Sequence, residues 1–356
     1  MAVHIRSALQ TLPTYVPGRS VPGAIKLASN ELSFPTLPVV AQAIADAVVD
    51  ESAGINRYPD NGAQALVDAL ARHTGAPATH VLAGCGSVAL CQQLVQATAE
   101  TGDEVLFGWR SFEMYPIVTQ ITGATPVRVP VTDSHELDLP AIADAITPAT
   151  RLIFICTPNN PTGTAVRRGE LESFLDRVPD DVLVTIDEAY SEFDDADESP
   201  DGLDYALTRP NVVTLRTMSK AYGLAGARVG YAVAEPSVIA AMRKVALTFA
   251  LSSLAQAAAL AALAAKDEYV PRWRQVIAER ERVTAALREA GYEVPTSRAN
   301  FVWLPLRERA AEFAAHTEQH KVIVRAFADA SGGVRVSIGA PAENDAFLAA
   351  ARSFPR

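Results

Sequence analysis

The stretch VVTLRTMSKAYGLAGARVG, residues 212–230, runs from a β-branched apolar segment past a single lysine into a glycine-rich connection. Ligands of open α/β sheets bind beyond the carboxyl ends of the strands, so Lys220 is expected at a ligand site. A lysine whose pKa is lowered by burial or by cationic neighbours forms a Schiff base with an aldehyde. Thr217, Ser219 and Arg228 add hydroxyl and guanidinium donors suited to a phosphate. An isolated Ser-Lys pair usually marks a surface lysine, but this whole string favours a site.

Short β-branched runs like the one before Lys220 recur along the chain and alternate with helical patterns. They occupy residues 80–87, 104–109, 124–131, 151–157, 182–190 and 212–217. This alternation predicts an α/β fold with one mainly parallel sheet between two layers of helices. After residue 266 a long charged helix precedes three further strand-like runs, which predict a smaller α+β lobe.

A second glycine-rich turn follows the first of these strands. Its helix begins at Gly86, Ser87 and Val88, whose amides would face a phosphate at the positive end of the helix dipole. The spacing in residues 84–89 also fits the dinucleotide fingerprint, which requires an acidic residue at the end of the next strand. The acidic pair at 103–104 lies at the start of that strand instead. The turn therefore favours the phosphate of a smaller cofactor.

Three further side chains suit a flat heterocycle. Asn160 lies in the turn NNPTG after a strand, where a carboxamide donates to an anionic oxygen and an Asn-Pro bond can be cis. Asp187 ends another strand and can hold a proton on a ring nitrogen. Phe112 can stack on the ring. Each has an ordinary structural explanation alone, but together with Lys220 they indicate pyridoxal 5′-phosphate, an electron sink once bound as an imine.

The order and spacing of NNPTG (159–163), DEAY (187–190) and SKAYGLAGARVG (219–230) resemble the fold-type I pyridoxal-phosphate aminotransferases, in their histidinol-phosphate aminotransferase branch. The likeness extends to YVPG, LASNE, NRYPD and VRVSIG, at residues 15–18, 27–31, 56–60 and 334–339. Within that branch, residues 84–94, 109–116 and 299–306 are most similar to actinobacterial phenylalanine (aromatic amino acid) aminotransferases.

The resemblance implies a role for each matching residue. Lys220 would form the Schiff base and move the substrate proton, while Asp187 would keep the pyridine nitrogen protonated. Asn160 and Tyr190 would bond the phenolic oxygen, and Phe112 would stack on the ring. The phosphate would be held by Gly86, Ser87, Val88, Thr217, Ser219 and Arg228.

The resemblance also implies a homodimer in which Tyr58 reaches the phosphate of the neighbouring subunit. Arg335 would bind the substrate carboxylate, or the phosphate of histidinol phosphate, with Arg325 and Tyr15 nearby. Residues 1–35 would form an N-terminal arm, 36–245 a large cofactor-binding domain, and 246–356 a small C-terminal domain that packs with the arm.

The implied reaction is transfer of the amino group of an aromatic amino acid, phenylalanine-like, to 2-oxoglutarate. Transamination of histidinol phosphate is the close alternative, and a decarboxylase or lyase on the same fold is a more distant one. The sequence does not distinguish biosynthesis from degradation.

Composition narrows the setting of this chemistry. The net charge of −10 with no basic patch argues against nucleic acid as a partner. The three cysteines are scattered, no metal-ligand spacing occurs, and no signal peptide is recognised, which together predict a cytoplasmic protein. Residues 245–265 carry no charge and are long enough for a membrane span. Their alanine, serine and threonine content predicts a buried interdomain helix instead.

Overall fold

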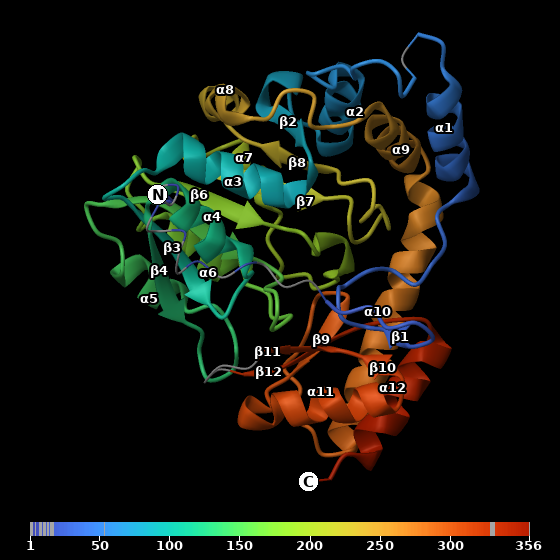
Figure 1. Cartoon of the computed structure of the whole chain (residues 1–356). Coiled ribbons are helices and arrows are strands. Elements are labelled where there is room, and N and C mark those ends of the chain that lie inside the picture. Colours follow the sequence, from blue (N-terminus) through green and yellow to red (C-terminus); the bar gives the residue numbers. More distant parts are fainter. Residues whose placement is uncertain are drawn as a thin grey trace.

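The computed structural model describes residues 3, 5–6, 9, 12, 14, 18–52, 54–327 and 332–355. Its largest element is a seven-stranded sheet with strand order β2-β8-β7-β6-β5-β3-β4 (Figure 1). The strands are β2 (Val81–Gly84), β3 (Glu104–Trp109), β4 (Thr125–Pro130), β5 (Thr150–Cys156), β6 (Leu183–Asp187), β7 (Val212–Thr217) and β8 (Gly230–Val233).

Parallel pairing joins β4, β3, β5, β6 and β7, which confirms the predicted mainly parallel sheet. Strand β8 differs, because it runs antiparallel to both β7 and β2. A parallel return requires a crossover, usually a helix. The connection from β7 to β8 contains no helix and instead forms the turn that carries Lys220.

Helices cover both faces of this sheet, as predicted. Alternate strand residues point to opposite faces, so Phe107 packs with α3, α4 and α8 while Leu106 joins the core on the other side. The helices in this part of the chain are α1 (Pro38–Val49), α2 (Gln64–Thr74), α3 (Gly86–Thr98), α4 (Met114–Thr122), α5 (Leu139–Asp144), α6 (Arg168–Leu175), α7 (Gly202–Ala206) and α8 (Pro236–Val245). Short 3-10 turns are η2 (Ala78–His80) and η3 (Ser191–Phe193).

A second, antiparallel sheet lies in the C-terminal part, with order β11-β12-β9. Its strands are β9 (Phe301–Leu304), β11 (Arg325–Phe327) and β12 (Gly333–Ser337), and its helices are α10 (Lys266–Glu289), η4 (Arg307–Arg309), α11 (Ala310–Gln319) and α12 (Pro341–Ser353). The run 322–327 divides between two sheets, because β10 (Val322–Ile323) pairs in parallel with β1 (Ile25–Lys26) of the N-terminal segment. Figure 1 shows these elements below the large sheet.

The uncharged run 245–265 is helical only in its second part, α9 (Ser253–Ala264). Its buried alanines at 255, 258, 259 and 262 let the helix lie close to α1. Among the residues that the structure describes, no helix is both long and apolar enough to cross a membrane.

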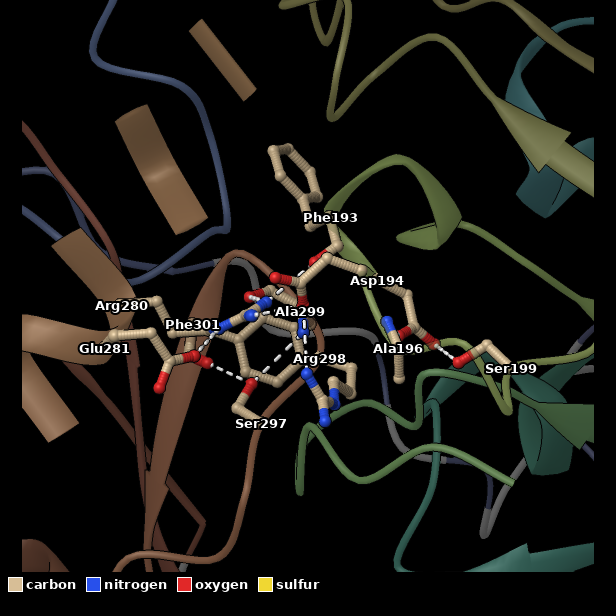
Figure 2. A network of polar contacts seen from close by, with 11 residues as sticks. Phe193, Asp194, Ala196, Ser199, Arg280, Glu281, Ser297, Arg298, Ala299 and Phe301 are labelled. Carbon is tan, nitrogen blue, oxygen red and sulfur yellow. Dashed lines mark hydrogen bonds and ion pairs between the residues drawn. The ribbon is translucent and has the colours of Figure 1, made fainter. Parts of the chain in front are cut away.

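A buried arginine ties the C-terminal sheet to the large sheet (Figure 2). Arg280 of α10 is 1% exposed and donates to the backbone oxygens of Phe193, at 2.8 Å, and Ala299, at 3.3 Å. Its guanidinium also meets the carboxylate of Asp195, which accepts a second bond from Arg298. One guanidinium therefore joins the segment after β6 to the segment that enters β9.

Candidate active site

A cavity of about 470 Å³ lies where the carboxyl ends of β5, β6 and β7 face the C-terminal sheet and residues 28–30. Most side chains predicted from the sequence line it: Ser87, Val88, Phe112, Asn160, Asp187, Tyr190, Thr217, Ser219, Lys220, Arg228, Arg325 and Arg335. All of these residues except Arg325 and Arg335, which belong to the C-terminal sheet, lie near one edge of the large sheet, as expected for an α/β fold.

Asp187 lies at the bottom of this cavity, at the end of β6, and is 2% exposed. Its Oδ2 accepts a 2.7 Å hydrogen bond from the hydroxyl of Tyr115. Its Oδ1 is buried and has no partner of good hydrogen-bond geometry among the described residues. Burial raises the pKa of Asp187 to about 6, against the opposing effect of the Tyr115 hydroxyl. A buried acceptor of this kind fits a protonated ring nitrogen, whose charge would favour the carboxylate.

Tyr115 is itself held rigidly. It is fully buried in α4 and stacks on Phe154 of β5, with ring centroids 4.4 Å apart. Phe112 packs edge-on against the same tyrosine and lines the cavity. The aromatic cluster thus fixes both the Asp187 carboxylate and the ring that is expected to cover a bound heterocycle.

The adjacent carboxylate has a different task. Glu188 points away from Asp187, since successive strand residues face opposite sides. It forms an ion pair with Arg216 at 2.8 Å and accepts from the amide of Gly202 at 2.6 Å. Glu188 therefore holds the framework, and of these two adjacent carboxylates Asp187 is the one that lines the cavity.

Lys220 is half-buried beside the cavity, which it lines, and its Nζ donates to the backbone oxygen of Ser29 at 3.1 Å. Burial, followed by the positive charge of Arg335, lowers the pKa of Lys220 to about 7. A substantial fraction of the amine is therefore neutral near pH 7 and able to attack an aldehyde.

Asn160 and Tyr190 face the cavity from the ends of β5 and β6. The Oδ1 of Asn160 accepts from Arg335, which leaves its amide nitrogen to donate elsewhere. Burial raises the pKa of Tyr190, so its hydroxyl remains a donor. The Asn160–Pro161 bond is cis. The preceding residue, Asn159, instead bonds the backbone of Arg110 and supports the turn.

The start of α3 forms the predicted phosphate turn. Gly86 has a φ of 75°, a conformation that suits glycine, and the first helical turn carries no acidic side chain. A Cβ at Gly230 of β8 would lie 2.6 Å from the amide nitrogen of Ser87. The backbone of the turn therefore rests directly on β8, with its amides at the helix N-terminus, where an anion binds well.

Hydroxyl and guanidinium groups complete this end of the cavity. Thr217 bonds Ser219 at 3.0 Å, and Arg228 donates to the Ser219 hydroxyl at 3.2 Å. Arg228 holds a φ of 60°, which is uncommon for a residue with a side chain. The cluster supplies the donors that a phosphate dianion requires.

Two arginines of the C-terminal sheet form the opposite wall. Arg335 is 8% exposed and donates to the backbone oxygen of Ala28 at 2.8 Å. Arg325 donates to the carboxylate of Glu113 at 3.0 Å and lies over the ring of Phe327. The carboxylate of Glu113 therefore offsets the positive charge that Arg325 brings to the cavity wall.

Two predicted residues lie elsewhere. Tyr58 is 81% exposed and stacks on Phe249 at 4.5 Å, and it does not belong to the cavity lining formed by the described part of this chain. Tyr15 lies outside the described residues. Gly86 shapes the phosphate turn through its backbone.

Several residues that contact the predicted ones were not themselves predicted as site residues. Ser29 and Asn30 bond Lys220 and Tyr190, Tyr115 bonds Asp187, and Glu113 pairs with Arg325. All of them lie within residues 27–31 and 109–116, two of the stretches that carry the resemblance. The resemblance therefore marks the stretches that contain these residues. It does not reveal their contacts, because the partners are far away in the sequence and no local pattern identifies them.

The residues fit pyridoxal phosphate as a set. A phosphate turn, an amine of lowered pKa, an unsatisfied carboxylate oxygen and two donors for a phenolic oxygen line one cavity. These groups match the phosphate, aldehyde, ring nitrogen and phenolic oxygen of that molecule.

Comparison with known proteins gives the family. The family model described as aminotransferase class I and II matches residues 22–351. The aromatic amino acid aminotransferase of Rhodococcus jostii is 58% identical over 353 residues, covering 99% of this chain and 96% of that protein. The enzyme of the same name from Mycobacteroides abscessus is 57% identical, covering 99% and 100%.

Solved structures agree with these relatives. The histidinol-phosphate aminotransferase of Sinorhizobium meliloti, determined in complex with pyridoxal-5′-phosphate, superposes with a TM-score of 0.88 at 29% identity. The superposition covers 99% of this chain and 97% of the Sinorhizobium meliloti chain. The predicted resemblance is confirmed, and the chain belongs to the class I and II aminotransferase family.

Proposed function

We propose that this protein is a pyridoxal-phosphate-dependent transaminase that moves the amino group of an aromatic amino acid to 2-oxoglutarate. The main structural observation behind this proposal is the ion pair between Glu113 and Arg325 in the cavity wall. It agrees with the full-length relatives that are named aromatic amino acid aminotransferase.

The roles of the residues follow from their contacts. Asp187 Oδ1 would accept from the ring nitrogen, and Asn160 and Tyr190 would donate to the phenolic oxygen. The turn at Gly86–Val88 with Thr217, Ser219 and Arg228 would hold the phosphate, and Phe112 would cover the ring. When bound, the cofactor supplies an electron sink for the bonds of the substrate α-carbon.

Lys220 is the residue placed to move protons. Its lowered pKa lets the amine accept a proton from the substrate α-carbon near pH 7 and give it back. Arg335 would orient the substrate by its α-carboxylate, because a guanidinium pairs with a carboxylate through two parallel bonds.

The distal part of the substrate would meet an apolar mouth. Phe112, Met114 and Phe327 line it, and Glu113, which also pairs with Arg110, partly offsets the charge of the nearby Arg325. A phosphate dianion in this place would have to compete with Glu113 for Arg325, whereas an aromatic ring would not. An aromatic donor therefore suits this mouth better than histidinol phosphate does.

A donor panel tests the substrate. With saturating 2-oxoglutarate, kcat/KM is measured for phenylalanine, tyrosine and histidinol phosphate on the purified protein. We expect the aromatic amino acids to give the larger values. A much larger value for histidinol phosphate would reverse the assignment, and release of carbon dioxide without a 2-oxo acid would indicate a decarboxylase.

We further propose a homodimer in which Tyr58 completes the neighbouring site. Tyr58 stacks on Phe249, and both side chains are exposed, as are those of Val49, Ile55 and Leu247, which lie near them in the sequence. Symmetric pairing of two copies would cover these side chains.

Subunit mixing tests this arrangement. Tyr58→Phe and Lys220→Ala are each expected to be weakly active or inactive alone. If Tyr58 acts across the interface, mixed dimers contain one site with both residues intact, and activity returns on mixing. A Tyr58 that acts within its own chain, or a monomeric protein by light scattering, would give no such recovery.

The division into an arm, 1–35, a large domain, 36–245, and a small domain, 246–356, also remains a proposal. The pairing of β1 with β10 supports the packing of the arm on the small domain. Scattered, unpaired cysteines support a cytoplasmic location.

A further inference from the structure

Three consecutive residues of the N-terminal segment contact three different groups of the site. The backbone oxygen of Ala28 accepts from Arg335, and that of Ser29 accepts from Lys220. The side chain of Asn30 donates from Nδ2 to the hydroxyl of Tyr190 at 2.9 Å. Ala28 and Ser29 make their contacts through backbone oxygens, which any residue type would provide. Asn30 uses its side chain, so its contact with Tyr190 depends on the residue type at position 30.

Asn30 is fixed on every side. It is 1% exposed, with a φ of 55°. Its amide donates to the hydroxyl of Ser337 at 2.8 Å, and that hydroxyl donates to Asn30 Oδ1 at 3.1 Å. Its backbone oxygen accepts from Asn300 at 3.1 Å. Since Ser337 occupies Oδ1, the amide nitrogen is the end that faces Tyr190.

This contact determines what the Tyr190 hydroxyl can do. A tyrosine hydroxyl has a single hydrogen to donate and also accepts. Because the hydroxyl accepts from Asn30, its hydrogen points to another acceptor. Tyr190 is 3% exposed, its ring packs edge-on against Phe301, and it lines the cavity. The hydrogen is therefore available to an acceptor inside the cavity.

We propose that Asn30 is a positioning residue, which makes the Tyr190 hydroxyl a donor to the phenolic oxygen of the bound cofactor. The inference rests on the proposed role of Tyr190. A donor on that oxygen withdraws negative charge that would otherwise retain a proton on the neighbouring Lys220 nitrogen. Asn30 thereby lowers the pH at which the loaded protein loses this proton.

Two substitutions of Asn30 are compatible with the positive φ at this position. Aspartate tolerates a positive φ and matches asparagine in size, but an ionised aspartate at position 30 only accepts, so Tyr190 would donate to it instead. Glycine also suits this φ and removes the side chain. Asn30→Asp and Asn30→Gly therefore test the donor without straining the segment, and thermal unfolding checks that both fold.

The experiment follows the visible absorbance of the bound cofactor against pH. Tyr190→Phe is expected to raise the midpoint, and Asn30→Asp to raise it by roughly half to one pH unit, the worth of one neutral hydrogen bond. Asn30→Gly should shift it in the same direction. Asn211→Asp, the same chemical change far from the cavity, should leave it unchanged.

The double variant separates positioning from charge. If Asn30 acts through Tyr190, Asn30→Asp adds no shift in the Tyr190→Phe protein. An equal shift in both backgrounds would show a direct effect of the new charge and overturn the proposal. A shift in Tyr190→Phe with none in either Asn30 variant would also overturn it, while leaving the role of Tyr190 intact. No shift in Tyr190→Phe would overturn that role and this inference together.

Discussion

The floor and the wall of the cavity are built in different ways. The floor consists of Asn160, Asp187 and Lys220, each within or just after a strand of one parallel sheet. The wall consists of residues 28–30 with Arg325 and Arg335, and it joins groups as far apart in sequence as Asn30 and Ser337. Under the proposed roles, we expect the chemistry common to the family to depend on the floor and the choice of substrate to depend on the wall.

The largest effect is expected from breaking the floor at its lysine. Lys220→Ala should remove the visible absorbance of the protein-bound cofactor and lower kcat by about 10⁴-fold or more, at the upper end for losing an acid–base group. Lys244→Ala, on the exposed end of α8, serves as the control and should match the unaltered protein. Substantial turnover in Lys220→Ala would refute the assignment of the floor.

The second effect separates the floor residue Asp187 from its neighbour Glu188, which does not line the cavity. Asp187→Asn should lower kcat by about 100-fold or more, because an amide does not hold the ring nitrogen protonated. Glu188→Gln breaks the buried pair with Arg216 and should cost about 3–5 kcal/mol of unfolding free energy. Steady-state kinetics measure kcat for both variants, and urea unfolding measures their free energy of unfolding. A near-normal kcat in Asp187→Asn would show that another group holds the proton.

The wall should respond in substrate binding. Arg335→Met removes a charge-assisted hydrogen bond of about 1.5–3 kcal/mol, which lowers kcat/KM for donor and acceptor by about 10- to 100-fold. The cofactor absorbance should persist, since the floor is intact. Unchanged KM values for both substrates would place the carboxylate site elsewhere.

The pH dependence of cofactor uptake tests a residue of the floor, Lys220, together with a residue of the wall, Arg335. Because burial and the charge of Arg335 lower the pKa of Lys220 to about 7, its amine is mostly neutral above that pH. The rate at which the cofactor-free protein takes up pyridoxal phosphate should rise about tenfold from pH 6 to pH 8 and then level off, unlike that of an ordinary lysine of pKa ~10.4. Arg335→Met should move the midpoint upward. A rate that still climbs at pH 9 would contradict the lowered pKa.

The smallest effect is expected at the rim of the wall. Glu113→Gln removes the carboxylate beside Arg325, so KM for glutamate and 2-oxoglutarate should fall by a few-fold, about the worth of a partly exposed ion pair. KM for phenylalanine should not improve. Equal changes for both substrates would mean that Glu113 does not influence selectivity.

The same contrast explains how far the sequence could predict this molecule. Strands such as β5, β6 and β7 are local apolar runs, and the carboxyl ends of parallel strands meet at one edge. Lys220, Asp187 and Asn160 could therefore be placed together without a structure.

The remaining features depend on long-range contacts. Nothing local shows that Asn30 donates to Tyr190, that Glu113 pairs with Arg325, or that Arg280 joins two backbone oxygens from separate segments. The antiparallel β8 and the non-helical first part of residues 245–265 follow from tertiary packing in the same way.

The pairing of β1 with β10 has a consequence for biosynthesis. Residues 25–26 leave the ribosome early, but their partners at 322–323 follow only after about 300 more residues, which takes roughly 15–60 s at ~5–20 residues per second. Ala28 and Asn30 likewise wait for their partners Arg335 and Ser337. A growing chain can complete its large sheet first, but it acquires a finished site only near the end of synthesis.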